Sequence, residues 1–344
     1  MIYIMKKVRL SDIAKKANSS ISAVSLALNN KQGVSKRKAD EIITIAHEMG
    51  YILPEEILQK NNSSIRLMMI INHGRILNPS HNPFLADYMF AVEVKAKELG
   101  YSVIFQSIDI NIYKQAIADF EKSAESGLII IGTELDLEFF LSFTCKKPVV
   151  FIDTYYPQCN FDFIDMNNHD IVWNIVEYLK DFGHKNIGFI QSSVLTGNFI
   201  AREVALKDAT SYFDIKLEPQ NIFRVDPTYK GSHNELKKEF ENLKTFPTAF
   251  FCSNDILAIG CINALTGRKI SIPEDISIIG FDNLPLAEAF SPAITSVKVK
   301  KIEIGSKAVD LLHRKLTDPS NMTSEKTLVS NKLIKRNSVL NISE

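Results

Sequence analysis

The sequence lacks the short motifs that mark the commonest classes of enzyme. It contains no GxGxxG or GxxxxGKS/T phosphate loop, no GxSxG nucleophile turn and no HExxH zinc motif. Its seven histidines are scattered without metal-ligand spacing. We therefore expect that the protein is not an enzyme and that it needs neither a cofactor nor a metal ion.

Long apolar runs and cysteine pairs are also absent. No stretch of 18 apolar residues occurs, and "MIYIMKKVRL" at the start lacks the apolar core and cleavage site of a signal peptide. The four cysteines form no CxxC motif, and Cys252 and Cys261 lie in apolar surroundings where cysteine acts as a small hydrophobe. These features predict a cytoplasmic protein with free thiols and no membrane association.

The chain has no net charge, but its charges are unevenly distributed. It holds 40 basic and 40 acidic residues, while residues 1–53 hold nine Lys/Arg against four Asp/Glu. This head therefore carries +5, and residues 54–344 carry −5. A basic head on an acidic body is typical of a polyanion-binding module attached to a second function.

The head is predicted to contain three helices. Apolar residues recur at helical spacing over 10–16, 21–28 and 36–49, and no strand-like run occurs there. Ser35 is a favourable N-cap for the third helix, and Gly50 is a favourable end. The string "SDIAKKANSSISAVSLALNN" (residues 11–30) thus fits a plain helical hairpin or a device that places its second helix in a DNA groove.

The body is predicted to alternate between strands and helices. Residues 54–64, "PEEILQKNNSS", are polar and predict a linker. After them, continuous apolar strands between helices predict parallel sheets covered on both faces, and about eight strands favour two doubly wound lobes. Strands are expected at 65–71, 101–108, 127–132, 148–153, 185–190, 221–225, 248–253 and 276–282. Helices are expected at 84–99, 169–182, 201–213, 230–243 and 255–265.

Two aspartates follow matching strands of the body. "VVFIDTYYP" and "SIIGFDNLP" each run an apolar strand into an aspartate, Asp153 and Asp282. Ligands of open α/β sheets bind at the carboxyl ends of the strands. Aspartate is also common there as a turn former, so the pattern alone leaves both roles open.

Residues 10–51 resemble the DNA-binding domain of the LacI/GalR family of bacterial transcription regulators. The match runs without a gap over the Asp-Ile-Ala of the first helix, Ser-x-x-x-Val-Ser in the second, Leu-Asn at its end and a closing Gly-Tyr. The body resembles the family's effector domain, most clearly in "VEYLKDFGHKNIGFI", "FFCSNDILAIG" and "PEDISIIGFDNLPLAEAFSPAITSV". The implied fold is a helix-turn-helix head on a two-lobed, periplasmic-binding-protein-like α/β body.

The resemblance also implies domain boundaries. The DNA-binding domain is expected at 1–53, a hinge linker at 54–64 and the effector-binding and dimerisation domain at 65–344. Within the last, the first lobe takes about 65–163 and 298–326, and the second takes about 164–297 and 327–340.

In such a head, helix one crosses the DNA backbone and helix two lies in the major groove. We expect Ile13, Ala14, Ala17, Val24 and Leu28 to form the core of the head. The resemblance places base readout at Ile21, Ser22 and Leu26, where family members often carry arginine or another hydrogen-bonding side chain. Aliphatic side chains there predict contacts to thymine methyl groups. Candidate phosphate contacts are Ser20, Ser25, Asn29, Ser35 and Arg37.

The family's linker inserts a leucine into the minor groove of the operator, and Leu58 matches that role, with Ile57 as the runner-up. Glu55 and Glu56 depart from the family, which tends to have neutral or basic residues there, and their carboxylates repel phosphate.

The implied effector ligands are Asp153, Arg202, Asn254 and Asp282. The alternative role of Asn254 is N-capping, and that of Arg202 is a surface salt bridge. Stacking surfaces for a ring are sought at Phe84, Tyr155, Tyr156 and Tyr229.

The favoured interpretation is a repressor of carbohydrate-related genes that binds a near-palindromic operator as a homodimer. Its effector is expected to be a sugar or a sugar derivative in the cleft between the lobes. The alternatives are a purine-type or protein co-effector, a sugar-binding receptor without a DNA role, and an enzyme built on the same doubly wound fold.

Overall fold

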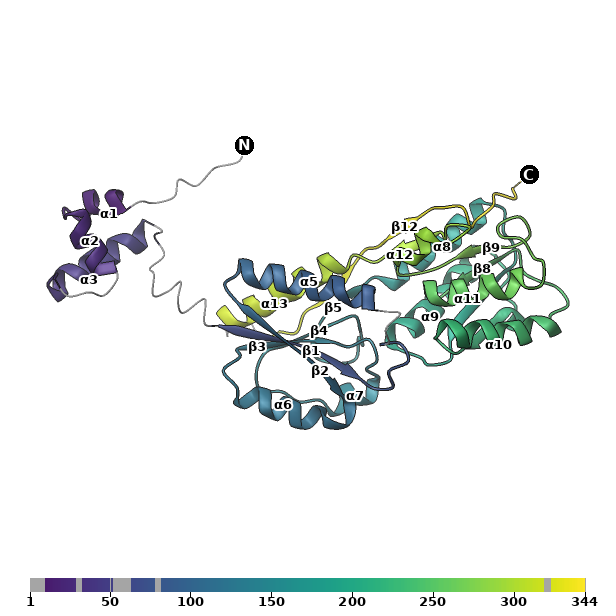
Figure 1. Cartoon of the computed structure of the whole chain (residues 1–344), viewed down its shortest axis with the longest axis horizontal. Coiled ribbons are helices and arrows are strands. Elements are labelled where there is room, and N and C mark those ends of the chain that lie inside the picture. Colours follow the sequence, from purple (N-terminus) through teal and green to yellow (C-terminus); the bar gives the residue numbers. More distant parts are fainter. Residues whose placement is uncertain are drawn as a thin grey trace. The chain divides into compact units, whose positions relative to one another are not determined.

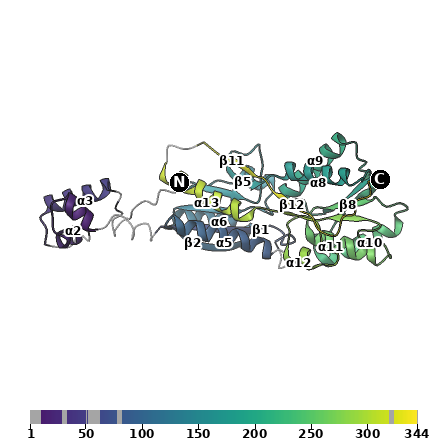
Figure 2. The same cartoon turned by 90° about the horizontal axis from the view of Figure 1, so that it is seen from above.

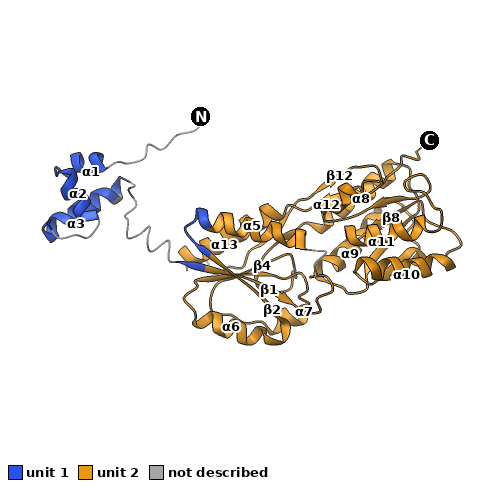
Figure 3. Ribbon diagram, viewed as in Figure 1, with its two compact units in different colours: residues 1–64, 97–102 blue, residues 65–96, 103–344 orange. Residues whose placement is uncertain are grey.

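The computed structural model describes residues 10–28, 33–49, 51, 63–77, 82–318 and 323–343. It separates into two compact units, residues 1–64 with 97–102 and residues 65–96 with 103–344 (Figure 3). Asn29, Gly50, Ile57 and Leu58, to which the sequence assigns roles, lie outside the described residues.

The smaller unit contains the expected helices α1 (Leu10–Lys16), α2 (Ile21–Leu28) and α3 (Lys36–Glu48). Asn18 adopts a left-handed conformation, φ +46°, that ends α1, and the Ser20 hydroxyl accepts the backbone N–H of Ala23 to cap α2. Lys38 of α3 donates to the carbonyl of Ala17 at 2.9 Å and thereby ties α3 to the end of α1. The predicted core is confirmed, because all of its members are buried: Ile13, Ala14, Ala17, Val24 and Leu28.

The larger unit has two lobes. The first lobe is built on a six-stranded sheet in the order β11-β5-β4-β3-β1-β2, and its β1–β3, β3–β4, β4–β5 and β5–β11 pairs are parallel. In Figure 1, α5 and α13 lie on one side of this sheet and α6 and α7 on the other. The strands are β1 (Ser64–Ile71), β2 (Ser102–Asp109), β3 (Gly127–Ile131), β4 (Val149–Ile152), β5 (Asp162–Met166) and β11 (Lys326–Val329). The helices are α5 (Asn82–Glu98), α6 (Tyr113–Lys122), α7 (Leu137–Ser142) and α13 (Lys301–Thr317).

The second lobe is built on a parallel four-stranded sheet in the order β7-β6-β8-β9. Every residue of β6 and β8 is buried, as expected for strands covered on both faces. Cys252 and Cys261 are fully buried in this lobe's core, as predicted. The strands are β6 (Ile187–Ser192), β7 (Ile222–Val225), β8 (Ala249–Cys252) and β9 (Ser277–Ile279). The helices are α8 (Asn168–Asp181), α9 (Gly197–Tyr212), α10 (Tyr229–Asn242), α11 (Asp255–Thr266) and α12 (Pro285–Ala289).

Three segments connect the lobes. The chain passes from β5 into α8, returns through β10 (Ser296–Lys298) to α13, and leaves again through β12 (Lys332–Ile334), which pairs antiparallel with β10. The chain that follows β11 runs from the first lobe through β12 toward the second lobe in Figure 2. Sheet pairing keeps β5 and β11 in the first lobe up to residues 166 and 329, a few residues beyond the lobe limits expected from the sequence.

Candidate functional site

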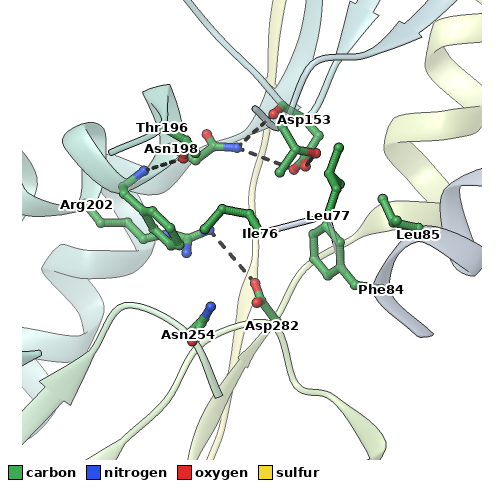
Figure 4. A pocket seen from close by; sticks show the side chains of 12 residues that line it. Ile76, Leu77, Phe84, Leu85, Asp153, Thr196, Asn198, Arg202, Asn254 and Asp282 are labelled. Atoms are coloured by element: carbon green, nitrogen blue, oxygen red, sulfur yellow. Dashed lines mark hydrogen bonds and ion pairs between the residues drawn. The ribbon is translucent and has the colours of Figure 1, made fainter. Parts of the chain in front are cut away.

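A cavity lies between the two lobes and is lined by residues from both (Figure 4). Its volume is about 30 Å³, which is room for about one or two water molecules. The four residues predicted to bind an effector all line it, although they come from four separate parts of the chain. The first lobe contributes Ile76, Leu77, Phe84, Leu85, Thr133 and Asp153, and the second contributes Thr196, Asn198, Phe199, Arg202, Asn254 and Asp282.

Arg202 on α9 is a buried, fixed cation rather than the partner of a surface salt bridge. Its Nε donates to Asn168 Oδ1 at 3.0 Å, and its Nη1 donates to the carbonyl of Ser253. Its Nη2 lies 3.9 Å from Asp282 Oδ1, and its guanidinium carbon lies 3.5 Å from the ring centroid of Phe281. Hydrogen bonds and stacking therefore hold the guanidinium in one orientation beside the cavity.

Asp153 follows β4 in a left-handed conformation, φ +58°. Its carboxylate accepts the hydroxyls of Tyr88, at 3.2 Å, and of Thr133, while Asn198 Nδ2 donates to its backbone carbonyl at 3.1 Å. Burial raises the pKa of Asp153 to about 6, against the opposing effects of Thr133 and Arg202. The hydroxyls fix this carboxylate at the first-lobe wall of the cavity.

Asp282 faces the cavity from the second lobe, also with a positive φ of +99°. Within the described part of the chain, the ionic partner of its carboxylate is Arg202, at 3.9 Å. Burial raises the pKa of Asp282 to about 7, although Arg202 and Lys301 oppose the shift. Asp282 thus combines a sparsely populated backbone conformation with a carboxylate that can accept further hydrogen bonds, and this combination is typical of ligand-binding positions.

Asn254 combines two roles, because its side chain accepts the backbone N–H of Leu257 at 2.9 Å and caps α11 while the residue lines the cavity. The neighbouring Asp255 instead accepts the backbone N–H of Leu284 at 2.7 Å and the Ser296 hydroxyl at 2.6 Å. It thereby fixes the loop after β9, which carries Asp282. Burial, reinforced by Asp282, raises the pKa of Asp255 to about 8.

Glu134 organises the apolar wall of the cavity, a role that the sequence did not suggest. Its carboxylate accepts five backbone N–H groups at 2.8–3.0 Å, from residues 72, 73, 74, 76 and 77. Burial would raise its pKa, but these bonds and that of the His73 side chain outweigh it and hold the pKa at about 2. The gathered loop carries Ile76 and Leu77 into the cavity.

Other residues at the cavity were not predicted from the sequence. Thr133 lies in the loop after β3, and Asn198 lies in the first turn of α9. Asp165 does not line the cavity; it lies in the unpredicted strand β5, where burial and then the neighbouring Asp153 raise its pKa well above its usual value. Of the aromatic candidates, Phe84 lines the cavity. Tyr156 instead donates to the carbonyl of Leu135 within the first-lobe core, Tyr155 packs against that core, and Tyr229 is 46% exposed.

The second helix of the head presents a mixed face. Ile21 is 54% exposed, Ser22 is exposed, and Leu26 and Ser25 are half-buried, while Ala27 joins Val24 and Leu28 in the core. Ser35 and Arg37 are exposed at the start of α3, and Ser20 caps α2. The described residues contain no helix long and apolar enough to cross a membrane and no cluster of potential metal ligands.

Two family models match the chain. Residues 9–53 match the bacterial regulatory proteins of the lacI family, and residues 176–339 match the periplasmic binding protein-like domain. Among curated proteins, the chain is 27% identical over 320 residues to the HTH-type transcriptional repressor PurR of Pasteurella multocida, covering 90% of this chain and 92% of that one. It is 28% identical over 317 residues to the repressor CytR of Escherichia coli, covering 88% of each.

Solved structures share the fold. The lac repressor dimer bound to operator and the anti-inducer ONPF matches with a TM-score of 0.72 and 21% identity, over 97% of this chain and 100% of that one. The complex of the transcriptional regulator CelR with cellobiose matches with a TM-score of 0.70 and 18% identity, over 96% and 99%. The three-helix head is therefore a DNA-binding domain of the lacI family of bacterial regulatory proteins, and it is joined to a two-lobed, periplasmic binding protein-like body.

Proposed function

We propose that the protein is a DNA-binding transcription regulator, a repressor, whose affinity for its operator is controlled by a small molecule bound between the lobes. The proposal rests on one observation. The chain joins a lacI-family head to a two-lobed body, and a cavity in that body is lined by Asp153, Arg202 and Asp282. Relatives named as transcriptional repressors support it over nearly the whole chain. Such a protein acts in the cytoplasm, where the DNA is.

In this proposal α2 reads the major groove. Ile21 and Leu26 pack on thymine methyl groups, and Ser22 bonds base edges. Ser20, Ser25, Asn29, Ser35 and Arg37 contact phosphates, and Leu58 of the linker enters the minor groove. The basic head supplies most of the affinity, so binding weakens steeply as salt rises.

The effector in this proposal is a sugar or a sugar derivative. The Asp282 carboxylate lacks close donors in the described residues, so hydroxyl groups of a ligand suit it. A volume of about 30 Å³ is far below the roughly 300–1,000 Å³ of ligand pockets, so the lobes must separate to admit the effector. A purine-type effector is the second candidate, because the rings of Phe84 and Phe199 line the same cavity and suit a planar base.

We further propose a homodimer whose subunits associate through the 65–344 domain, with 1–53 reading DNA and 54–64 as the hinge. Exposed apolar side chains support such a surface: Phe90 and Val94 on α5, and Ile104 and Phe105 on β2. A two-fold symmetric dimer explains a near-palindromic operator.

The test begins with selection of bound fragments from genomic DNA, followed by gel shifts over a salt series. We expect one near-palindromic site and a linear fall of log affinity with log salt. A thermal-shift panel of sugars and nucleobases then identifies effectors, whose effect on operator binding is measured. Binding that ignores salt and sequence contradicts the DNA role, and turnover of a panel sugar would establish an enzyme instead.

A further inference from the structure

A second cavity lies beside the connections between the lobes and plays no part in the function proposed above. Its volume is about 680 Å³, and it is lined by the ends of β10 and β12, the start of α13 and Asp87 of α5. Four of its ten lining residues are lysines: Lys298, Lys300, Lys301 and Lys332. The acidic lining residues are Asp87 and Glu303, so the lining carries a net charge of +2.

One of the four lysines is neutralised within the protein. Lys301 is buried, its Nζ lies 2.7 Å from Asp87 Oδ2, and it also lies 4.5 Å from the ring centroid of Phe84. The other three, Lys298, Lys300 and Lys332, are exposed and have no ion-pair partner among the described residues. The remaining carboxylate, Glu303, lies 3.9 Å from Lys307 on its own helix.

Two of the uncompensated lysines face each other. Lys298 and Lys332 are directly paired across the antiparallel β10–β12 ladder, so their side chains project from the same face. Like charges in such a pair are destabilising. The strands that join the lobes therefore carry two lysines that repel each other next to an open cavity.

The start of α13 adds to the conflict. Lys300 occupies the N-cap position and makes no capping hydrogen bond with its side chain, and Lys301 follows it. Cations at a helix N-terminus are unfavourable, because that end already carries partial positive charge. An anion bound between these lysines would relieve both the cross-strand repulsion and the unfavourable start of the helix. The uncompensated lysines around the cavity therefore indicate an anion-binding site.

We propose that this second cavity binds a small phosphate-bearing molecule, held by Lys298, Lys300 and Lys332. A phosphate monoester carries about −1.5 to −2 charge at neutral pH, which balances the +2 lining. The volume falls within the roughly 300–1,000 Å³ of small-molecule sites, which favours a metabolite over a docked macromolecule. Because β10 and β12 connect the lobes, occupancy also stabilises one arrangement of these connections.

The test uses the full chain and inorganic pyrophosphate as the probe, in equilibrium dialysis at fixed ionic strength. We expect one saturable site per chain. The variant Lys298→Gln/Lys332→Gln should bind pyrophosphate about tenfold more weakly or worse, because two charge-assisted contacts are lost. The control Lys237→Gln/Lys244→Gln removes the same charge from exposed lysines outside the cavity and should bind like the unaltered chain.

Thermal unfolding gives a second readout. Without pyrophosphate, Lys298→Gln/Lys332→Gln should melt at a higher temperature than the unaltered chain, because the repulsion is gone. Pyrophosphate should raise the melting temperature of the unaltered chain and of the control, but not that of the cavity variant. Binding that persists undiminished in the cavity variant assigns the anion to the basic head and overturns the proposal, as does the absence of saturable binding at millimolar pyrophosphate. Neither outcome depends on operator binding.

Discussion

Glu134 Oε1 accepts the backbone N–H of Leu77 at 2.8 Å, across 57 residues of sequence. The same carboxylate gathers four further amides of the loop that follows β1. The apolar wall of the cavity between the lobes is therefore positioned by one buried charge. Glu134 does not itself line the cavity, but it holds the loop that places Ile76 and Leu77 there.

Replacing Glu134 with glutamine tests this dependence. The substituted side chain keeps one acceptor oxygen and turns two donors toward the loop amides, so we expect a free energy of unfolding about 2–3 kcal/mol lower. Amide hydrogen exchange at residues 72–77 should speed up in the folded state. Glu125→Gln is the control, since Glu125 is another buried carboxylate of this lobe, held by Arg66. If both variants accelerate exchange in the loop equally, Glu134 has no special role there.

The stability of the chain should depend on pH through Asp282. Its pKa rises from 3.8 to about 7 on folding, so the folded state keeps a proton that the unfolded state has lost. The free energy of unfolding is therefore highest below about pH 4 as far as this group is concerned, and it falls as the pH rises to about 7. Asp282→Asn should remove a slope worth on the order of 1–3 kcal/mol between about pH 5 and 8.

The control for Asp282 is Asp208→Asn, which changes an exposed aspartate of α9 and should leave the slope unaltered. Burial also raises the pKa values of Asp153 and Asp255, to about 6 and 8, so both carboxylates still contribute to the pH dependence in each variant, and the contribution of Asp282 is the difference between the two profiles. Unfolding measured by urea at several pH values gives these slopes. An Asp282→Asn profile parallel to that of the unaltered chain would show that this carboxylate does not titrate as the geometry indicates.

Arg202→Lys should separate effector sensing from DNA binding. Lysine cannot reproduce the three-way hold on Asn168, Ser253 and Asp282, so the response of operator binding to the effector should be lost. Affinity for operator without effector should stay within about threefold, because the head is unchanged. Arg224→Lys, on an exposed arginine paired with Glu203 in the same lobe, should keep the response. A retained response in Arg202→Lys removes this residue from the effector site.

The aliphatic readout by α2 can be tested one methyl group at a time. Replacing the thymines that face Ile21 and Leu26 with uracil removes only the C5 methyl, and each replacement should cost about 0.5–1 kcal/mol of operator affinity. Ile21→Ser should be insensitive to its own thymine-to-uracil replacement while it remains sensitive at the base facing Leu26. Anisotropy titrations of the four combinations give the coupling energy, and a value near zero means that no methyl contact exists.

Local patterns predicted most of the fold. The helices of the head begin and end within a residue of their expected limits, and all eight expected strands are present, because apolar periodicity reports directly which face of an element is buried. The sequence does not predict strand β5, because Asp162 and Asp165 interrupt its apolar pattern. The first lobe therefore extends a few residues further along the chain than the sequence analysis expects. The short strands β10 and β12 carry too few residues for any periodicity to show.

Short-range patterns were enough to predict the two doubly wound lobes, the three-helix head and the positions of Asp153 and Asp282 at strand ends. The choice of Asp153, Arg202, Asn254 and Asp282 as effector ligands came instead from the family resemblance. It took the folded chain to reveal that these four meet in one small cavity, that Glu134 shapes its wall, and that Lys298 faces Lys332. The physical reason is that burial periodicity is a short-range property of the chain. Charge compensation and hydrogen bonding act between residues that only folding brings together, so their partners and their pKa values cannot be read along the sequence.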